Sequence, residues 1–246
     1  MNNVLLAFIL TSIAGFSTMV GTLIIFLKNK NHNKIIVASL SFASSIMICI
    51  SICDLVPESI AMLSNYFNSI CTCIFCFLFI IIGILISIII DYKLPNNEKL
   101  YKVGIISMLA IIIHNVPEGI ATFIATTSDI NLGISLTLAI ALHNIPEGIA
   151  ISIPIYYSTK SKKKALLYTV ISALSEPFGA LITFLFLKKY ITTKILGLLF
   201  ATIAGIMLQI SLCELLPNAK SYHLKKYCRL FFTIGCIFSC VYFTIF

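Results

Sequence analysis

Eight apolar segments occupy almost the whole of this sequence, each close to the ~20 residues that a helix needs to cross a bilayer. A backbone surrounded by lipid must satisfy its own hydrogen bonds, which continuous apolar runs of this length do as helices. We therefore expect an all-α, polytopic membrane protein with eight transmembrane helices and short loops. Residues 1–246 should form a single transmembrane domain. The segments run approximately over residues 4–27, 35–63, 70–91, 103–127, 132–157, 165–187, 194–217 and 227–246.

Composition and charge agree with this prediction. Only 11% of the residues are charged, whereas a soluble domain carries about 25%, so the lipid bilayer is the expected partner. The net charge of +8 comes from short basic clusters between apolar segments, which favours membrane topology over nucleic-acid binding. Fourteen of the 17 basic residues lie in one set of alternate loops, and only Lys188, Lys189 and Lys194 lie in the other set. The positive-inside rule predicts a multi-pass cell-membrane protein with both termini outside the cytoplasm.

Two stretches of the chain resemble each other. Residues 44–59 and 204–219 align without gaps at an offset of 160, and Asp54 then stands opposite Glu214. The first stretch lies in the second helix, which runs outward, and the other lies in the seventh helix, which runs inward. This predicts an inverted repeat of helices 1–3 and 6–8 around helices 4 and 5, a design typical of secondary transporters.

The central helices carry two copies of one hexapeptide, His-Asn-x-Pro-Glu-Gly, at residues 114–119 and 143–148. Imidazole, amide and carboxylate groups are costly in hydrocarbon, so paired clusters at mid-span indicate a function. His and Glu four residues apart share one face of a helix. The prolines free a backbone carbonyl one turn earlier and should bend the helices, while the glycines let another helix approach closely.

The donor atoms of these motifs suit a divalent transition metal. The two helices offer two His, two Glu and two Asn, enough for one site or for two adjacent sites with bridging carboxylates. A further acid near mid-membrane, Glu176 in the sixth helix, is a candidate for the same site, or it pairs with a neighbouring helix. Asp54, Glu58 and Glu214 lie nearer the ends of their helices, where they either line a route for the ion or are interfacial carboxylates. Cys71-x-Cys73-x-x-Cys76 lacks a second pair at zinc-ribbon spacing, so a packing role is favoured for it.

The tandem motifs resemble those of the ZIP (Zrt/Irt-like) divalent-metal transporters, in particular the bacterial zinc-uptake branch, and the resemblance covers the whole chain. It implies a binuclear metal site built mainly by helices 4, 5 and 6. One metal position would use His114, Glu118, His143 and Glu147. The neighbouring position would use Asn115, Asn144 and Glu176, with Glu118 and Glu147 bridging.

The resemblance also implies import of the metal into the cytoplasm without ATP, by alternating access or an elevator-like motion, in a homodimer. The cation would be Zn²⁺, or Fe²⁺, Mn²⁺, Co²⁺ or Cd²⁺, bound as cargo with no prosthetic group. Two features depart from the family pattern. The loop at about residues 91–102 has no histidine, and some relatives carry an acid at the position of Asn144, which gives the second metal position less charge here.

Two other functions are alternatives to transport of a divalent metal. An intramembrane metal-dependent hydrolase needs a tightly held metal, an activated water and a general base. The sequence has no His-Glu-x-x-His signature for one, and an inverted repeat has no obvious use in an enzyme. A proton- or sodium-coupled carrier of another solute would make little use of paired histidines. A metal importer without enzymatic activity is therefore the main prediction.

Overall fold

The computed structural model describes residues 3–26, 31–94, 98–187 and 192–245. Within these ranges the chain is helical apart from short turns, and eight helices or stacked helices are long and apolar enough to cross a membrane. The eight predicted spans are thereby confirmed. Lys28, Lys30, Lys188 and Lys189, on which part of the charge asymmetry depends, lie outside the described residues.

Five of the eight spans are a single helix or a helix with one short extension, and the other three are interrupted. The first span is α1 (Asn3–Thr22) with η1 (Leu23–Phe26), and the third, fourth, fifth and eighth are α4 (Ser69–Lys93), α5 (Lys99–Ser128), α6 (Ile130–Thr159) and α11 (Lys225–Ile245). The second span combines α2 (His32–Ile50), η2 (Ser51–Leu55) and α3 (Val56–Ser64). The sixth combines α7 (Lys162–Ala173), α8 (Ser175–Ile182) and η3 (Thr183–Leu187), and the seventh combines α9 (Thr193–Gln209), η4 (Ile210–Leu215) and α10 (Leu216–Ser221).

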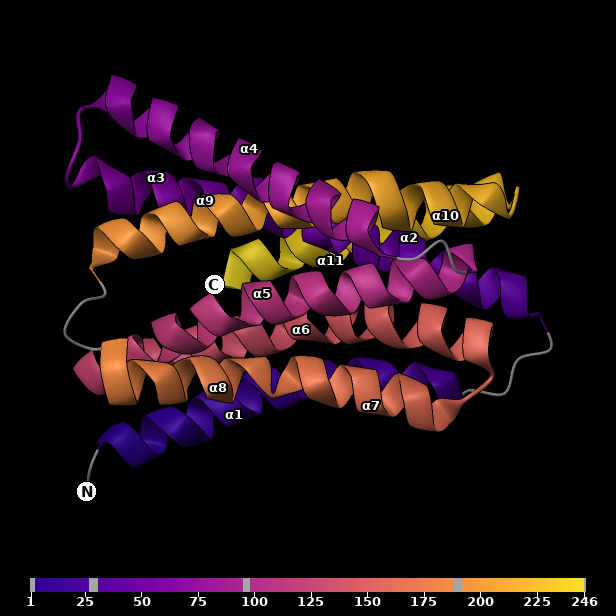
Figure 1. The fold of residues 1–246 in the computed structure, drawn as a ribbon, viewed down its shortest axis with the longest axis horizontal. Coiled ribbons are helices and arrows are strands. Elements are labelled where there is room, and N and C mark those ends of the chain that lie inside the picture. The colour runs from indigo at the N-terminus through magenta and orange to yellow at the C-terminus, as the bar shows by residue number, and fades with distance from the viewer. Residues whose placement is uncertain (1–2, 27–30, 95–97, 188–191, 246) are drawn as a thin grey trace.

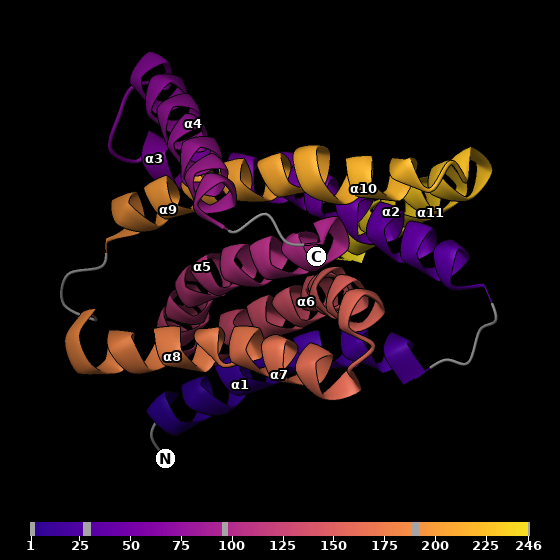
Figure 2. The same ribbon diagram turned by 45° about the vertical axis from the view of Figure 1, so that its right-hand side comes forward.

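The helices form two layers (Figures 1 and 2). One layer contains α1, α5, α6, α7 and α8, and the other contains α2, α3, α4, α9, α10 and α11. In the first layer α1 packs on α6 and α8 packs on α5, while in the second α11 packs on α2 and α4 packs on α9. The predicted inverted repeat equates spans 1, 2 and 3 with spans 6, 7 and 8, and span 4 with span 5. Under this correspondence the contact of α1 with α6 matches that of α8 with α5. The contact of α11 with α2 likewise matches that of α4 with α9, as the repeat requires.

The backbone supplies a second sign of the repeat. The second and seventh spans both contain a π-helical turn, η2 at Ser51–Leu55 and η4 at Ile210–Leu215. The offset of 160 found in the sequence maps one turn onto the other. Each turn carries an acid, and each is followed at once by a helix with proline in its first positions. π-Helical turns are rare and concentrate at functional sites. Chance similarity between two apolar helices therefore does not explain a π-helical turn at the same position of both repeats.

Close helix contacts hold each layer together. A β-carbon added to any of the eleven glycines would touch atoms of the same layer, and for most of them the nearest is a backbone oxygen. Gly83 and Gly205, for example, bring α4 and α9 together at the carbonyls of Thr202 and Ile80. In lipid, where apolar burial drives association weakly, contacts of this kind supply much of the packing energy. The two layers meet instead through larger apolar side chains of α2, α5, α6 and α9.

Candidate metal centre

The link between α5 and α6 sets both hexapeptides at one depth. Asp129 alone separates the two 30-residue helices, and its side chain accepts hydrogen bonds from the backbone N–H groups of Asn131 and Leu132. A connection this short forces the two helices to run antiparallel as neighbours. The first motif ends ten residues before Asp129 and the second begins fourteen residues after it, so the two motifs come opposite each other to within about one helical turn.

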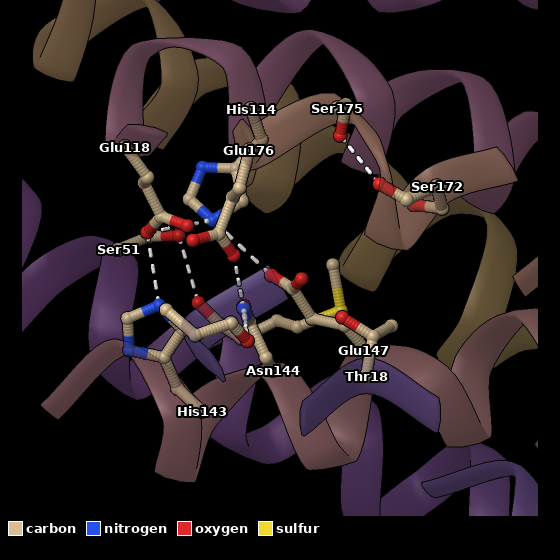
Figure 3. A network of polar contacts seen from close by, with 12 residues as sticks. Thr18, Ser51, His114, Glu118, His143, Asn144, Glu147, Ser172, Ser175 and Glu176 are labelled. Carbon is tan, nitrogen blue, oxygen red and sulfur yellow. Dashed lines mark hydrogen bonds and ion pairs between the residues drawn. The ribbon is translucent and has the colours of Figure 1, made fainter. Parts of the chain in front are cut away.

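Four of the predicted ligands form one buried cluster (Figure 3). Glu118 Oε1 lies 3.1 Å from Nε2 of His114 and 2.9 Å from Nε2 of His143. Nε2 of His114 also lies 3.1 Å from Oε1 of Glu147, on the other helix. One ligand atom each from His114, Glu118 and His143 lies within 4.8 Å of the others, and all three residues are at most 4% exposed.

The pairing of the motifs across the two helices is not symmetrical. Glu118 contacts the histidine of its own turn and that of the other helix, so it bridges both imidazoles. Glu147 is paired with His114 of the other helix, and no contact with His143 of its own turn is found among the described residues. Within the cluster, the ligands are thus arranged by the packing of α5 on α6 as much as by helical spacing.

A second group of predicted ligands adjoins this cluster. The Asn144 amide donates to Oε1 of Glu176, on α8, and to the backbone carbonyl of Ala14, on α1, at 3.0 Å. Three spans of one layer, the first, fifth and sixth, therefore meet at one side chain. Asn144 and Glu176 are both fully buried.

Several polar atoms of these residues have no hydrogen-bond partner within the described parts of the chain. They include the Oε2 atoms of Glu118, Glu147 and Glu176, Oδ1 of Asn144 and both amide atoms of Asn115. A buried polar atom left unpaired costs about 1–3 kcal/mol, more if it is charged, so each one calls for an explanation. Most of them are oxygen acceptors, and oxygen acceptors beside two imidazoles are the donor set that zinc and similar cations take.

The motif glycines hold the other helices against the site. A β-carbon on Gly119 would overlap the backbone oxygen of Glu176, and one on Gly148 would overlap that of Thr18. This confirms the prediction that these positions admit close helix contacts. Both helices continue through their prolines without a break in their helical assignment, so the predicted bend stays a prediction.

The three acids nearer the helix ends lie outside the cluster. Asp54 lies in η2, where it accepts a 3.5 Å hydrogen bond from the Tyr242 hydroxyl. Glu58 is exposed, and Glu214 lies in η4, close enough to Asp91 and Lys102 to interact with their charges.

One neighbour of the cluster was missed from the sequence. The Tyr242 ring lies edge-on to that of His143, with 6.3 Å between ring centroids and 71° between ring planes. It comes from α11, in the other layer. A lone aromatic residue in a C-terminal apolar segment carries no signal of such a contact.

The chain is similar to known proteins over most of its length. A family described as "ZIP Zinc transporter" matches residues 95–242. The chain is 41% identical to "Zinc transporter ZupT" of Chlorobaculum parvum, with 90% of each chain covered. It is 40% identical to the protein of that name from Streptococcus mutans, over 90% of this chain and 91% of the relative, and 37% identical to that of Clostridium perfringens, over 92% of each.

Proposed function

Because the chain belongs to the ZIP family of zinc transporters, we propose that it imports divalent transition-metal cations through the buried site between α5, α6 and α8. It is a multi-pass membrane protein and a metal transporter rather than an enzyme, and the relatives give no support to the alternative of an intramembrane hydrolase. Zn²⁺ is the expected cargo, and Fe²⁺, Mn²⁺, Co²⁺ and Cd²⁺ suit the same ligands.

One observation carries the assignment of the site. His114, Glu118 and His143 converge within 4.8 Å in the middle of a bilayer-spanning bundle, where uncompensated polar groups are costly. Glu147 completes this first position. Asn115, Asn144 and Glu176 form a second position beside it, with Glu118 and Glu147 between the two. The carboxylates offset the charge of a dication that has left water.

The two layers support transport by alternating access. Nearly all of the proposed ligands belong to α5 and α6, and Glu176 belongs to α8 of the same layer. Close backbone contacts at the glycines lie within the layers and none joins one layer to the other. A layer held together in this way can shift as a unit against the other and carry the site with it. We expect the termini to face outward and the protein to work as a homodimer.

Uptake by reconstituted protein tests the assignment. Liposomes containing the purified protein and an internal zinc-sensitive dye should show uptake without ATP. Glu118→Gln and Glu147→Gln each remove a charge near the cation, worth at least about 4 kcal/mol at an effective dielectric constant of about 20. We expect uptake to fall to the level of empty liposomes. His114→Ala should also abolish uptake.

The matched control is Glu98→Gln, which makes the same chemical change at an exposed residue that precedes α5. This variant should transport like the wild type. Undiminished uptake in both Glu118→Gln and Glu147→Gln would overturn the proposed site. Absence of uptake in the wild type, with correctly folded protein in the liposomes, would overturn the proposed direction or cargo.

A further inference from the structure

The carboxylates hold the imidazole of His143 less firmly than that of His114. Nε2 of His114 lies 3.1 Å from a carboxylate oxygen of both Glu118 and Glu147. Among the described residues, Nε2 of His143 is paired with Glu118 alone, at 2.9 Å. Metal-binding histidines usually donate their other ring nitrogen to a further group, which fixes the plane of the ring. Neither Nδ1 atom has a hydrogen-bond partner in the described parts of the chain, so packing has to fix the His143 ring.

The Tyr242 ring provides this packing. It lies edge-on to the imidazole, with 6.3 Å between centroids and 71° between planes, which is a favoured arrangement of two aromatic rings. Tyr242 is buried, and its ring also contacts that of Phe243, with 5.1 Å between centroids. Its hydroxyl donates to Oδ2 of Asp54 at 3.5 Å, which is a long hydrogen bond, so the ring contacts are the larger part of its interactions. The tyrosine that faces His143 is thus itself held in place.

Tyr242 approaches the site from the other layer. It lies in the last turn of α11, and this end of α11 lies between the two layers, near the middle of the molecule (Figures 1 and 2). His143 lies on α6, in the layer that contains the other proposed ligands. The contact between the two rings therefore joins the layers at the metal centre itself.

Packing of α11 on α2 does not by itself call for a tyrosine at this position. Gly235 of α11 and Gly83 of α4 make equivalent contacts in the two halves of the inverted repeat, each against a backbone oxygen of the partner helix, at positions related by the offset of 160. Seven residues beyond Gly235 stands Tyr242, and seven residues beyond Gly83 stands Ile90. The corresponding position in the other half is thus filled by an aliphatic side chain, and the aromatic ring stands where a histidine of the site lies beside it.

We propose that Tyr242 is a positioning residue of the transport site, whose ring holds the His143 imidazole with Nε2 directed at Glu118. This inference deepens the proposed function and rests on it, since it takes His143 as a ligand of the transported cation. A ligand that is held in place before the cation arrives loses little freedom on binding, so the cation is bound more tightly.

The origin of this support in the other layer has a consequence for transport. When one layer shifts against the other, the Tyr242 ring is withdrawn from His143. The affinity of the site then falls as the layers move, which helps the cation to leave.

The zinc affinity of the intact purified protein tests the proposal, measured by competition with a chromogenic chelator. Tyr242→Leu removes the ring and should weaken zinc binding by roughly tenfold, the lower end of the range for loss of a group that orients a metal ligand. Tyr242→Phe keeps the ring and should bind zinc within about threefold of the wild type, since only a long hydrogen bond is lost. In liposomes, Tyr242→Leu should raise the KM for zinc uptake by a similar factor and leave the maximal rate within about twofold of the wild type.

Two comparisons separate positioning from ordinary helix packing. Phe238→Leu removes another edge-on ring pair between α11 and α2, the one with Phe42 at 5.9 Å between centroids, and it touches no proposed ligand. This variant should bind zinc like the wild type. His143→Ala should bind zinc more weakly, and adding Tyr242→Leu to it should cause no further loss, because a residue that acts through His143 then has nothing to act on.

Three results would overturn the proposal: wild-type affinity in Tyr242→Leu, an equal loss in Phe238→Leu, or a further loss when Tyr242→Leu is added to His143→Ala. A failure of the proposed transport site looks different, because Glu118→Gln and His143→Ala would then leave the zinc affinity unchanged. That result would overturn both inferences, whereas a loss in these two variants without one in Tyr242→Leu overturns the positioning role alone.

Discussion

The substitution Gly119→Ala tests the packing that holds Glu176 at the metal centre. A β-carbon at this position would overlap the backbone oxygen of Glu176 and lie 2.8 Å from its carbonyl carbon. Ordinary van der Waals contact begins at 3.4 Å, so α5 and α8 would have to separate by at least 0.6 Å, the difference between these distances. The obstructing atoms are backbone and cannot rotate away, so we expect the upper end of the ~1–3 kcal/mol that overpacking costs.

The same displacement predicts a loss of transport. A binding site must hold its groups within about 0.5 Å of their productive positions, and an error of about 1 Å can cost a hundredfold in rate. A shift of α8 moves Glu176 away from Asn144 and from Glu118 and Glu147, which we propose to bridge the two metal positions. We therefore expect zinc uptake by Gly119→Ala liposomes to fall by about tenfold or more, with a lower melting temperature of the purified protein.

Gly197→Ala is the matched control, in the other layer. A β-carbon there would lie 3.0 Å from Cβ of Met62, 3.1 Å from Cγ of Leu63 and 3.2 Å from the backbone oxygen of Ser59, so these neighbours have to move by only a few tenths of an ångström. This variant should keep most of the wild-type uptake. The reasoning is refuted if Gly119→Ala transports zinc like the wild type, or if the two alanine variants are equally impaired.

Three other substitutions probe single contacts. Asn144→Ala removes the side-chain amide that donates to both Glu176 and the backbone carbonyl of Ala14 in α1. Zinc uptake should then fall several-fold without being abolished. Ser87→Ala leaves Gln209 without its buried partner and should lower the free energy of unfolding by about 1–3 kcal/mol, measured by denaturation in detergent. Lys102→Ala breaks a partly exposed 2.7 Å ion pair between α4 and α5, and should change that free energy by less than about 1 kcal/mol. A large effect of Lys102→Ala, or none of Ser87→Ala, would contradict this ranking.

Much of the architecture could be predicted from the sequence, because the bilayer restricts the choices. Long apolar runs must be helices, and the spans and the inverted repeat follow from length and offset, whereas the one-residue link between the two central helices is seen only in the structure. The depth of Glu176 in its helix made it a candidate for the site or for pairing with a neighbouring helix, and the structure brings it to Asn144 of α6.

The remaining features depend on how helices pack, which local spacing does not encode. Helical spacing predicts His143 beside Glu147, yet the closest carboxylate to His143 is that of Glu118, from the other helix. The π-helical turn at Ser51–Leu55 adds one residue to a turn of helix, and nothing in its composition marks it. Tyr242 reaches the site from a distant span, so its role depends on the arrangement of the layers.

The bridge that Glu118 makes between His114 and His143 has a consequence for how tightly cargo is held. Nε2 of each histidine and Oε1 of Glu118 and of Glu147 lie 2.9–3.1 Å from another group of the cluster, whereas the second oxygen of each carboxylate has no hydrogen-bond partner among the described residues. Binding of a cation is therefore partly an exchange of these contacts and partly the pairing of oxygens that were unpaired. The departing ion leaves behind imidazoles and carboxylates that still face one another. A site built this way can select a cation by its ligand chemistry and still let it go.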